Sequence, residues 1–67
     1  MTLKTLRERY KPGIKVRLIH MDDIQAPPPG AIGVVQHVDD AGSIHVAWST
    51  GGGLALIPSV DQFEIVD

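Results

Sequence analysis

Short runs in which apolar and polar residues alternate, each ended by Gly, Pro or Asp, fill almost all of the chain after Tyr10. Alternation of this kind predicts half-buried β-strands, because successive side chains of a strand point to opposite faces of the sheet. A domain of 67 residues buries only about 60% of the surface that its unfolded chain exposes. We therefore expect a very small β-barrel or sandwich around one core.

Five strands are expected, and the alternation indicates which face of each is buried. They span residues 14–20, 32–38, 43–48, 54–57 and 63–66. The inward side chains are expected to be Ile14, Val16 and Leu18 in the first strand, Ile44, Val46 and Trp48 in the third, and Leu54 and Leu56 in the fourth. The single tryptophan is expected to be the main packing residue of the core.

The second and third strands are joined by a turn with a specific chemistry. Residues 39–42, Asp-Asp-Ala-Gly, suit a type I turn whose glycine is left-handed in a bulged hairpin. Such a turn sets the register of the two strands. It places Val38 opposite Ile44 and His37 opposite His45.

Prolines and glycines shape the segment between the first two strands. Residues 21–30 contain three consecutive prolines at 27–29, which exclude a helix or a central strand and predict a rigid, extended loop. Gly30 can adopt a positive φ and turn the chain into the second strand. Gly33 is expected at a bend or bulge of that strand, where the missing side chain permits curvature.

The first 12 residues are expected to form a helical arm. Thr5 can cap a short helix over residues 6–10, and Leu3, Leu6 and Tyr10 lie on one face of it. A helix of this length is not stable alone, so it should pack its apolar face on the sheet. Residues 1–12 and the barrel of residues 13–67 form a single domain, 1–67.

The order of these elements is strand, long loop, strand, tight turn, strand, short turn, strand, helical turn and strand. This is the order of SH3-like barrels. The expected fold is therefore all-β, a small SH3-like five-stranded barrel with a short N-terminal helix.

A set of motifs extends over nearly the whole chain. They are Val16-x-Leu18, Met21-Asp22-Asp23, Pro27-Pro28-Pro29-Gly30, Gly33-x-Val35, Val38-Asp39-Asp40-x-Gly42-x-Ile44-His45-Val46-x-Trp48, Leu54-x-Leu56-Ile57-Pro58 and Asp61-x-Phe63. These motifs resemble a bacterial and phage-associated family of small proteins known as domain of unknown function 4314. The resemblance implies an SH3-like fold and carries no established activity.

Charge is divided unevenly along the chain. The first 17 residues hold all six Lys and Arg and one acid, Glu8, for a net +5, while the other seven acids give the remaining 50 residues −7. The first interpretation is that the two parts neutralise each other, within one molecule or across a homodimer. The alternative is weak nucleic-acid binding, as in KOW-like small barrels, through Arg7, Arg9, Lys11, Lys15 and Arg17.

Nothing in the sequence predicts an enzyme, a cofactor or a metal site. The hydroxyl-bearing residues of the barrel fall in or beside turns, where they bond the local backbone, and no base is placed for them. His37 and His45 could hold a metal only with a third ligand such as Asp22, Asp23 or Asp39, and motifs such as HxH and HExxH are missing. The chain also has no cysteine, so it has neither a thiolate site nor a disulfide.

The sequence therefore favours a non-enzymatic binding or adaptor module that recognises another protein. Loops on a rigid scaffold commonly carry recognition. The candidate surface combines the long loop with the tip of the next hairpin: Asp22, Asp23, Pro27, Pro28, Pro29, Gly30, Ser49 and Thr50. The lack of cysteine suits a reducing cytoplasm, and no apolar stretch is long enough for a signal peptide or a membrane span, so a cytoplasmic protein is expected.

Overall fold

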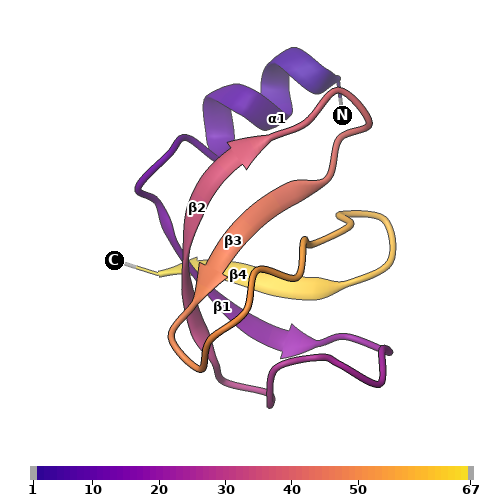
Figure 1. Ribbon diagram of the computed structural model, residues 1–67. Coiled ribbons are helices and arrows are strands. Elements are labelled where there is room, and N and C mark those ends of the chain that lie inside the picture. Colours follow the sequence, from indigo (N-terminus) through magenta and orange to yellow (C-terminus); the bar gives the residue numbers. More distant parts are fainter. Residues whose placement is uncertain (1, 67) are drawn as a thin grey trace.

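The structure, a computed structural model, describes residues 2–66 and contains one short helix and four strands (Figure 1). In chain order they are α1 (Leu3–Arg9), β1 (Lys15–His20), β2 (Ile32–Val38), β3 (Ile44–Trp48) and β4 (Gln62–Val66). The strands form one antiparallel sheet in the order β3-β2-β1-β4. The prediction of a mostly β domain with a short N-terminal helix is confirmed.

One apolar core lies on the concave face of the sheet and under α1. Its buried side chains within residues 2–66 are Leu6, Val16, Leu18, Ala31, Val35, Val38, Ile44, Val46, Trp48 and Leu56. The predicted alternation is confirmed in β1 and β3, because their inward positions are buried and their other positions are half-buried or exposed. Ile14, also predicted to face inward, precedes β1 and is half-buried against the core. Tyr10 and Phe63 close the core at one side, with ring centroids 5.6 Å apart.

The helix begins earlier than the sequence indicates. Thr2, rather than Thr5, is its N-cap, and the hydroxyl of Thr2 accepts a hydrogen bond of 3.2 Å from the backbone N–H of Thr5. The two threonines are equivalent caps in chemistry, and the earlier one brings Leu3 into the helix so that it packs beside Leu6 on the core. None of the helical structure in residues 2–66 has the length and apolar character needed to cross a membrane.

The β2–β3 hairpin has the predicted register. Val38 pairs with Ile44 and His37 with His45, and Gly42 has a φ of +87°. The irregularity in this pairing lies between Val35 and His37, not at Gly33.

A glycine occupies position 33 because the core is closely packed there, and not because β2 bends at that residue. It lies opposite Trp48, and a Cβ on Gly33 would overlap the side chain of Val46 and lie 2.8 Å from Cε3 of the indole. A glycine is required because the core side chains of β3 reach the backbone of β2.

The expected fourth strand, residues 54–57, does not form. Only Leu56 pairs, in an isolated bridge with Ile44. The carbonyl of Leu54 instead accepts a 2.8 Å hydrogen bond from the indole N–H of Trp48, and the N–H of Ile57 donates to Asp61 at 2.8 Å. The first of these bonds takes a carbonyl that a ladder with β3 would use, and the sheet described for residues 2–66 has four strands rather than five and is open.

The loop between β1 and β2 contains no helix or strand, as predicted. Asp23 accepts a hydrogen bond of 2.8 Å from the backbone of Gln25, and Ala31 donates to the carbonyl of Pro28 at 3.0 Å. Gly30 has a φ of +91° and donates to Leu18 at 2.7 Å. Both ends of the loop are thus tied by local hydrogen bonds.

Candidate functional site

A groove of about 330 Å³ lies between the loop after β1 and the turn before β4. Both segments are on the right-hand side of Figure 1. Its lining comes from residues 21–23, Ser43, Leu54, Ala55, Ile57, Val60 and Asp61. We call this site the acidic groove.

The acidic groove combines carboxylates with exposed apolar side chains. Asp23 and Asp61 each use one oxygen for a backbone N–H, at 2.8 Å, and keep the other oxygen available. No Lys or Arg occurs after position 17, and the ion pairs within residues 2–66 do not involve the carboxylates of the groove. Val60 is 65% exposed and Ile57 47%. The groove is therefore suited to a segment that carries both positive charge and apolar surface.

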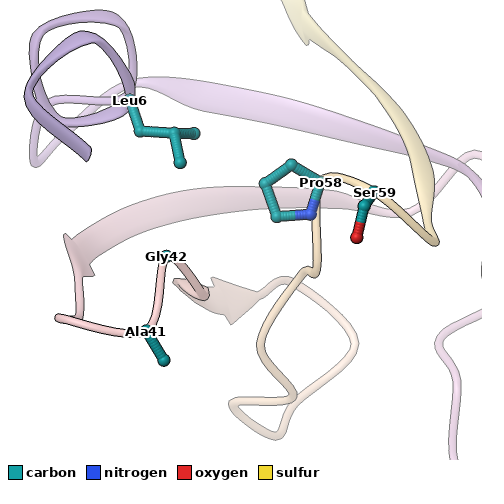
Figure 2. A pocket seen from close by; sticks show the side chains of 5 residues that line it. All are labelled: Leu6, Ala41, Gly42, Pro58 and Ser59. Atoms are coloured by element: carbon teal, nitrogen blue, oxygen red, sulfur yellow. The ribbon is translucent and has the colours of Figure 1, made fainter. Parts of the chain in front are cut away.

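A second hollow, of about 420 Å³, lies beside the first (Figure 2). Leu6 of α1 points across it toward Pro58, with Gly42 and Ala41 of the hairpin opposite, and Ser59 completes the lining. None of the described residues that line this hollow is charged. The turn of residues 57–61 separates the two, because Pro58 and Ser59 face one while Ile57, Val60 and Asp61 face the other.

The predicted recognition residues are divided by the fold. Asp22 and Asp23 line the acidic groove. The other predicted residues line neither hollow: Pro27 is half-buried, and Pro28, Pro29, Gly30, Ser49 and Thr50 are exposed. The backbone of Ser49 bonds Ile32 at 2.8 Å, which holds the hairpin tip at the start of β2, next to the end of the long loop.

Several lining residues were missed by sequence reasoning. Ser43, Ala55, Val60 and Asp61 have no pattern that marks them for binding, since they belong to turns or to a segment interpreted as a core strand. The bridge between Leu56 and Ile44 brings residues 54–57 beside Ser43, and the pairing of Gln62 with His20 brings Val60 and Asp61 to the end of β1.

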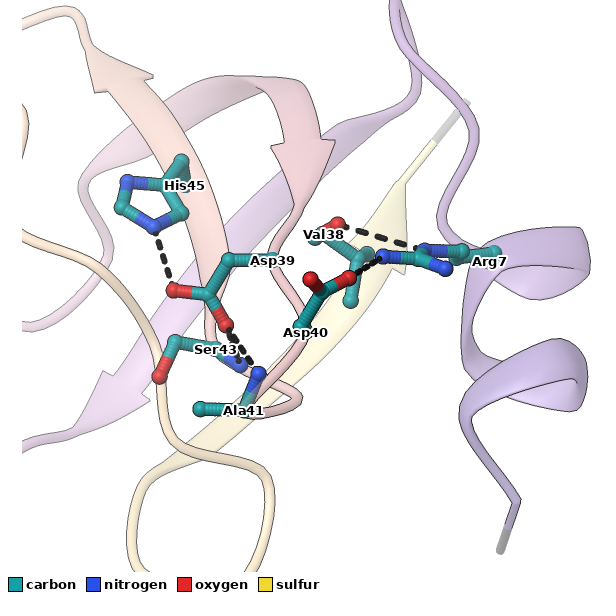
Figure 3. Close-up of polar contacts among 7 residues, drawn as sticks. All are labelled: Arg7, Val38, Asp39, Asp40, Ala41, Ser43 and His45. Atoms are coloured by element: carbon teal, nitrogen blue, oxygen red, sulfur yellow. Dashed lines mark hydrogen bonds and ion pairs between the residues drawn. The ribbon is translucent and has the colours of Figure 1, made fainter.

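Two of the predicted nucleic-acid contacts take part in internal ion pairs. Arg7 donates to Asp40 at 2.7 Å and to the carbonyl of Val38 at 3.3 Å, which ties α1 to the hairpin (Figure 3). Arg17 donates to Glu64 across β1 and β4 at 2.7 Å. The other three, Arg9, Lys11 and Lys15, are exposed and form no ion pair within residues 2–66. We call these five cations, Arg7, Arg9, Lys11, Lys15 and Arg17, the basic segment. Neutralisation within the molecule, the first interpretation of the charge division, applies to Arg7 and Arg17.

His37 and His45 stack on the outer side of the hairpin, with ring centroids 4.3 Å apart and an angle of 7° between the rings. Nε2 of His45 lies 2.8 Å from Oδ2 of Asp39, and Oδ1 of Asp39 accepts from Ala41 and Ser43 (Figure 3). Within residues 2–66 no group of three His or acidic residues is placed to hold a metal ion. The His45–Asp39 contact instead supports the turn.

The Asp39 contacts predict an acid-sensitive hairpin. The hydrogen bond from His45, followed by the backbone bond from Ser43, lowers the pKa of Asp39 below its ordinary value. A lowered pKa means that the carboxylate stabilises the fold above about pH 4 and that this stabilisation is lost as the pH falls through the pKa of the folded state. Urea unfolding of wild type and Asp39→Asn between about pH 2 and 6 should show a steeper acid loss in the wild type. The same dependence of the free energy of unfolding on pH in both proteins would contradict the lowered pKa of Asp39.

The Arg7–Asp40 pair predicts a small effect. Asp40 is 96% exposed and Arg7 47%, so water and salt screen the attraction. A double-mutant cycle with Arg7→Ala and Asp40→Ala should give a coupling of about 0.2–1 kcal/mol. Arg7→Ala alone should cost more than Asp40→Ala, because it also removes the bond to the Val38 carbonyl. Equal single-variant costs would show that this second bond contributes nothing.

Comparison with known proteins identifies one match. A family model described as a domain of unknown function (DUF4314) matches residues 1–66. No curated protein and no solved structure matches the chain. The matched region includes every residue of the acidic groove and of the basic segment. The description of the family gives no ligand or activity, so the chemistry of the site has to be inferred from its residues.

Proposed function

Because the chain belongs to the DUF4314 family, whose description assigns no activity, we propose its function from its surface: a small, non-enzymatic module that binds a protein partner in the acidic groove. The observation that carries this proposal is the combination in one concave site of spare carboxylate oxygens and the exposed side chains of Ile57 and Val60. Protein interfaces characteristically surround buried apolar contacts with polar groups that set orientation.

We also propose that the fold is an SH3-like barrel with an incomplete fourth strand. Two observations support this proposal: the sheet order β3-β2-β1-β4, and the Leu56–Ile44 bridge, which places residues 54–57 beside β3. With that bridge, each of the five predicted strand segments lies next to another one in a single row. The motif resemblance and the lack of cysteine support a bacterial or phage protein of the cytoplasm.

Weak nucleic-acid binding through the basic segment is the less favoured function. Two of the five predicted contacts, Arg7 and Arg17, already pair with carboxylates, and the chain has a net charge of −2. Phosphate binding depends on cations that are free to replace counterions. Arg9, Lys11 and Lys15 remain exposed for such a role.

Affinity capture from the source cell tests the proposed function. The baits are wild type, the groove variant Ile57→Ser/Val60→Ser, and the control Ile24→Ser, which removes a fully exposed apolar side chain outside the groove. We expect a protein that is retained by wild type and by the control and lost from the groove variant. Titration calorimetry with that purified protein should show binding to wild type and to the control and no binding to the groove variant.

Two results would overturn the proposal. One is a set of captured proteins that does not change when Ile57 and Val60 are replaced. The other is fluorescence anisotropy showing DNA or RNA binding that falls steeply with salt and is lost in Arg9→Ala/Lys11→Ala/Lys15→Ala, which would establish the nucleic-acid function instead.

A further inference from the structure

We propose that the occupant of the acidic groove is the basic turn of a second copy of this chain. The basic turn comprises residues 9–13, Arg-Tyr-Lys-Pro-Gly, at the end of α1. This inference rests on the proposed function, because it names the partner that the groove would bind.

Charge complementarity within one sequence is the first argument. Within residues 2–66 the groove is lined by three carboxylates and no Lys or Arg, while every Lys and Arg of the chain lies within residues 4–17. Arg9 and Lys11 are exposed and, within residues 2–66, unlike Arg7 and Arg17, form no ion pair. The two surfaces therefore carry opposite charges that no contact inside one described molecule neutralises.

The basic turn is held rigid, which favours docking. Gly13 has a φ of +95° and donates to the Val35 carbonyl at 2.8 Å, and Ile14 donates to Lys11 at 3.1 Å. A preformed turn loses little conformational freedom on binding. Pro12, exposed beside Lys11, supplies an apolar surface for Ile57 and Val60.

The two surfaces lie on opposite sides of the molecule. In Figure 1 the basic turn is on the left, and the loop after β1 and the turn before β4 are on the right. One copy therefore cannot fill its own groove, and the contact between copies is head-to-tail. Such a contact extends into chains unless the rotation between copies closes a ring.

The association is expected to be weak and sensitive to salt. Exposed ion pairs contribute little individually and are screened as ionic strength rises. In sedimentation velocity at about 50 mM NaCl, the average mass should rise with protein concentration into the submillimolar range. The rise should be much smaller at about 500 mM NaCl.

Two charge reversals identify the surfaces involved. Asp22→Lys changes a groove carboxylate that has no hydrogen bond within residues 2–66, so the backbone bonds of Asp23 and Asp61 are kept. Lys11→Glu changes the turn. Each variant alone should associate on the order of tenfold more weakly than wild type, because like charges then face each other. An equimolar mixture should associate again, because each variant retains the intact surface that the other has lost.

Gln25→Lys is the matched control, since it adds a cation to the same loop at a position that does not line the groove. It should associate like wild type. Circular dichroism of every variant checks that the fold is kept.

A strictly monomeric wild type at low salt would overturn the inference, and so would a mixture of the two variants that stays monomeric. Neither result affects the proposed function if a captured protein still depends on Ile57 and Val60. Conversely, captured proteins that do not depend on Ile57 and Val60, with self-association intact, would overturn the proposed capture of other proteins in the groove while leaving the contact between copies in place.

Discussion

Replacing Trp48 with alanine should remove a large part of the free energy of unfolding of this domain. The indole is only 4% exposed within the core cluster, and its N–H donates to the Leu54 carbonyl at 2.8 Å. Removing a buried aromatic side chain costs about 3–5 kcal/mol. A domain of 67 residues has a total stability of about 3–10 kcal/mol, so this loss takes a large part of it.

Urea unfolding followed by far-ultraviolet circular dichroism measures the effect, because the substitution removes the only tryptophan fluorophore. Trp48→Phe is the control that keeps an aromatic ring and removes the N–H. It should cost about 1–3 kcal/mol, since a buried carbonyl loses its donor and the smaller ring leaves a cavity. An alanine variant as stable as the phenylalanine variant would contradict the central packing role of Trp48.

Gly33→Ala is expected to have the second largest effect. A Cβ at this position would overlap Val46 and lie 2.8 Å from Cε3 of Trp48, near the start of β2, where Gly33 pairs with Val16 on one side and Trp48 on the other. Overpacking a well-filled core costs about 1–3 kcal/mol. The cost should reach the upper part of that range because two core side chains must move together.

Gly53→Ala provides the matched control for the same chemical change. A Cβ on Gly53 would make an ordinary contact of 3.8 Å with the Val46 carbonyl, so its effect should stay within about 0.5 kcal/mol. Combining Gly33→Ala with Val46→Ala should cost less than the sum of the two single variants, since the methyl groups that overlap are removed. Equal stability losses for Gly33→Ala and Gly53→Ala in urea titrations would refute the close approach of β3 to β2.

Much of the fold follows from patterns that neighbouring residues create. The turn at residues 39–42 determines the hairpin register because its left-handed Gly42 and the Asp39 side chain act over four residues. The buried faces of β1 and β3 follow from alternation, which depends only on the geometry of a strand.

The errors arise where a distant residue competes for a local group. Residues 54–57 alternate like a strand, but the Trp48 indole takes the Leu54 carbonyl that a ladder with β3 would use. Gly33 suggested a bulge, but the side chains of Val46 and Trp48 require it. The helix start differs because Thr2 and Thr5 are equal caps locally, and packing of Leu3 favours the earlier one.

The candidate site was predictable only in part. Asp22 and Asp23 were expected on a recognition loop, and both line the acidic groove. Their neighbours across the groove, Val60 and Asp61, follow them by more than thirty residues, and no spacing rule connects such positions. The charge division was visible in the sequence, but which cations are used internally was decided by the Arg7–Asp40 and Arg17–Glu64 pairs.

The sequence by itself determined the strand periodicity, the hairpin turn, a proline loop without helix or strand, and the separation of basic from acidic residues, because each depends on residue type and short spacing. The tertiary structure alone decided that the fourth strand is replaced by a single bridge, that a glycine faces the tryptophan, and that carboxylates and apolar side chains from separate segments share one groove. Those features depend on contacts across the folded core. There, a carbonyl bonded to a side chain is not free to pair with a strand, and space filled by one side chain is closed to another.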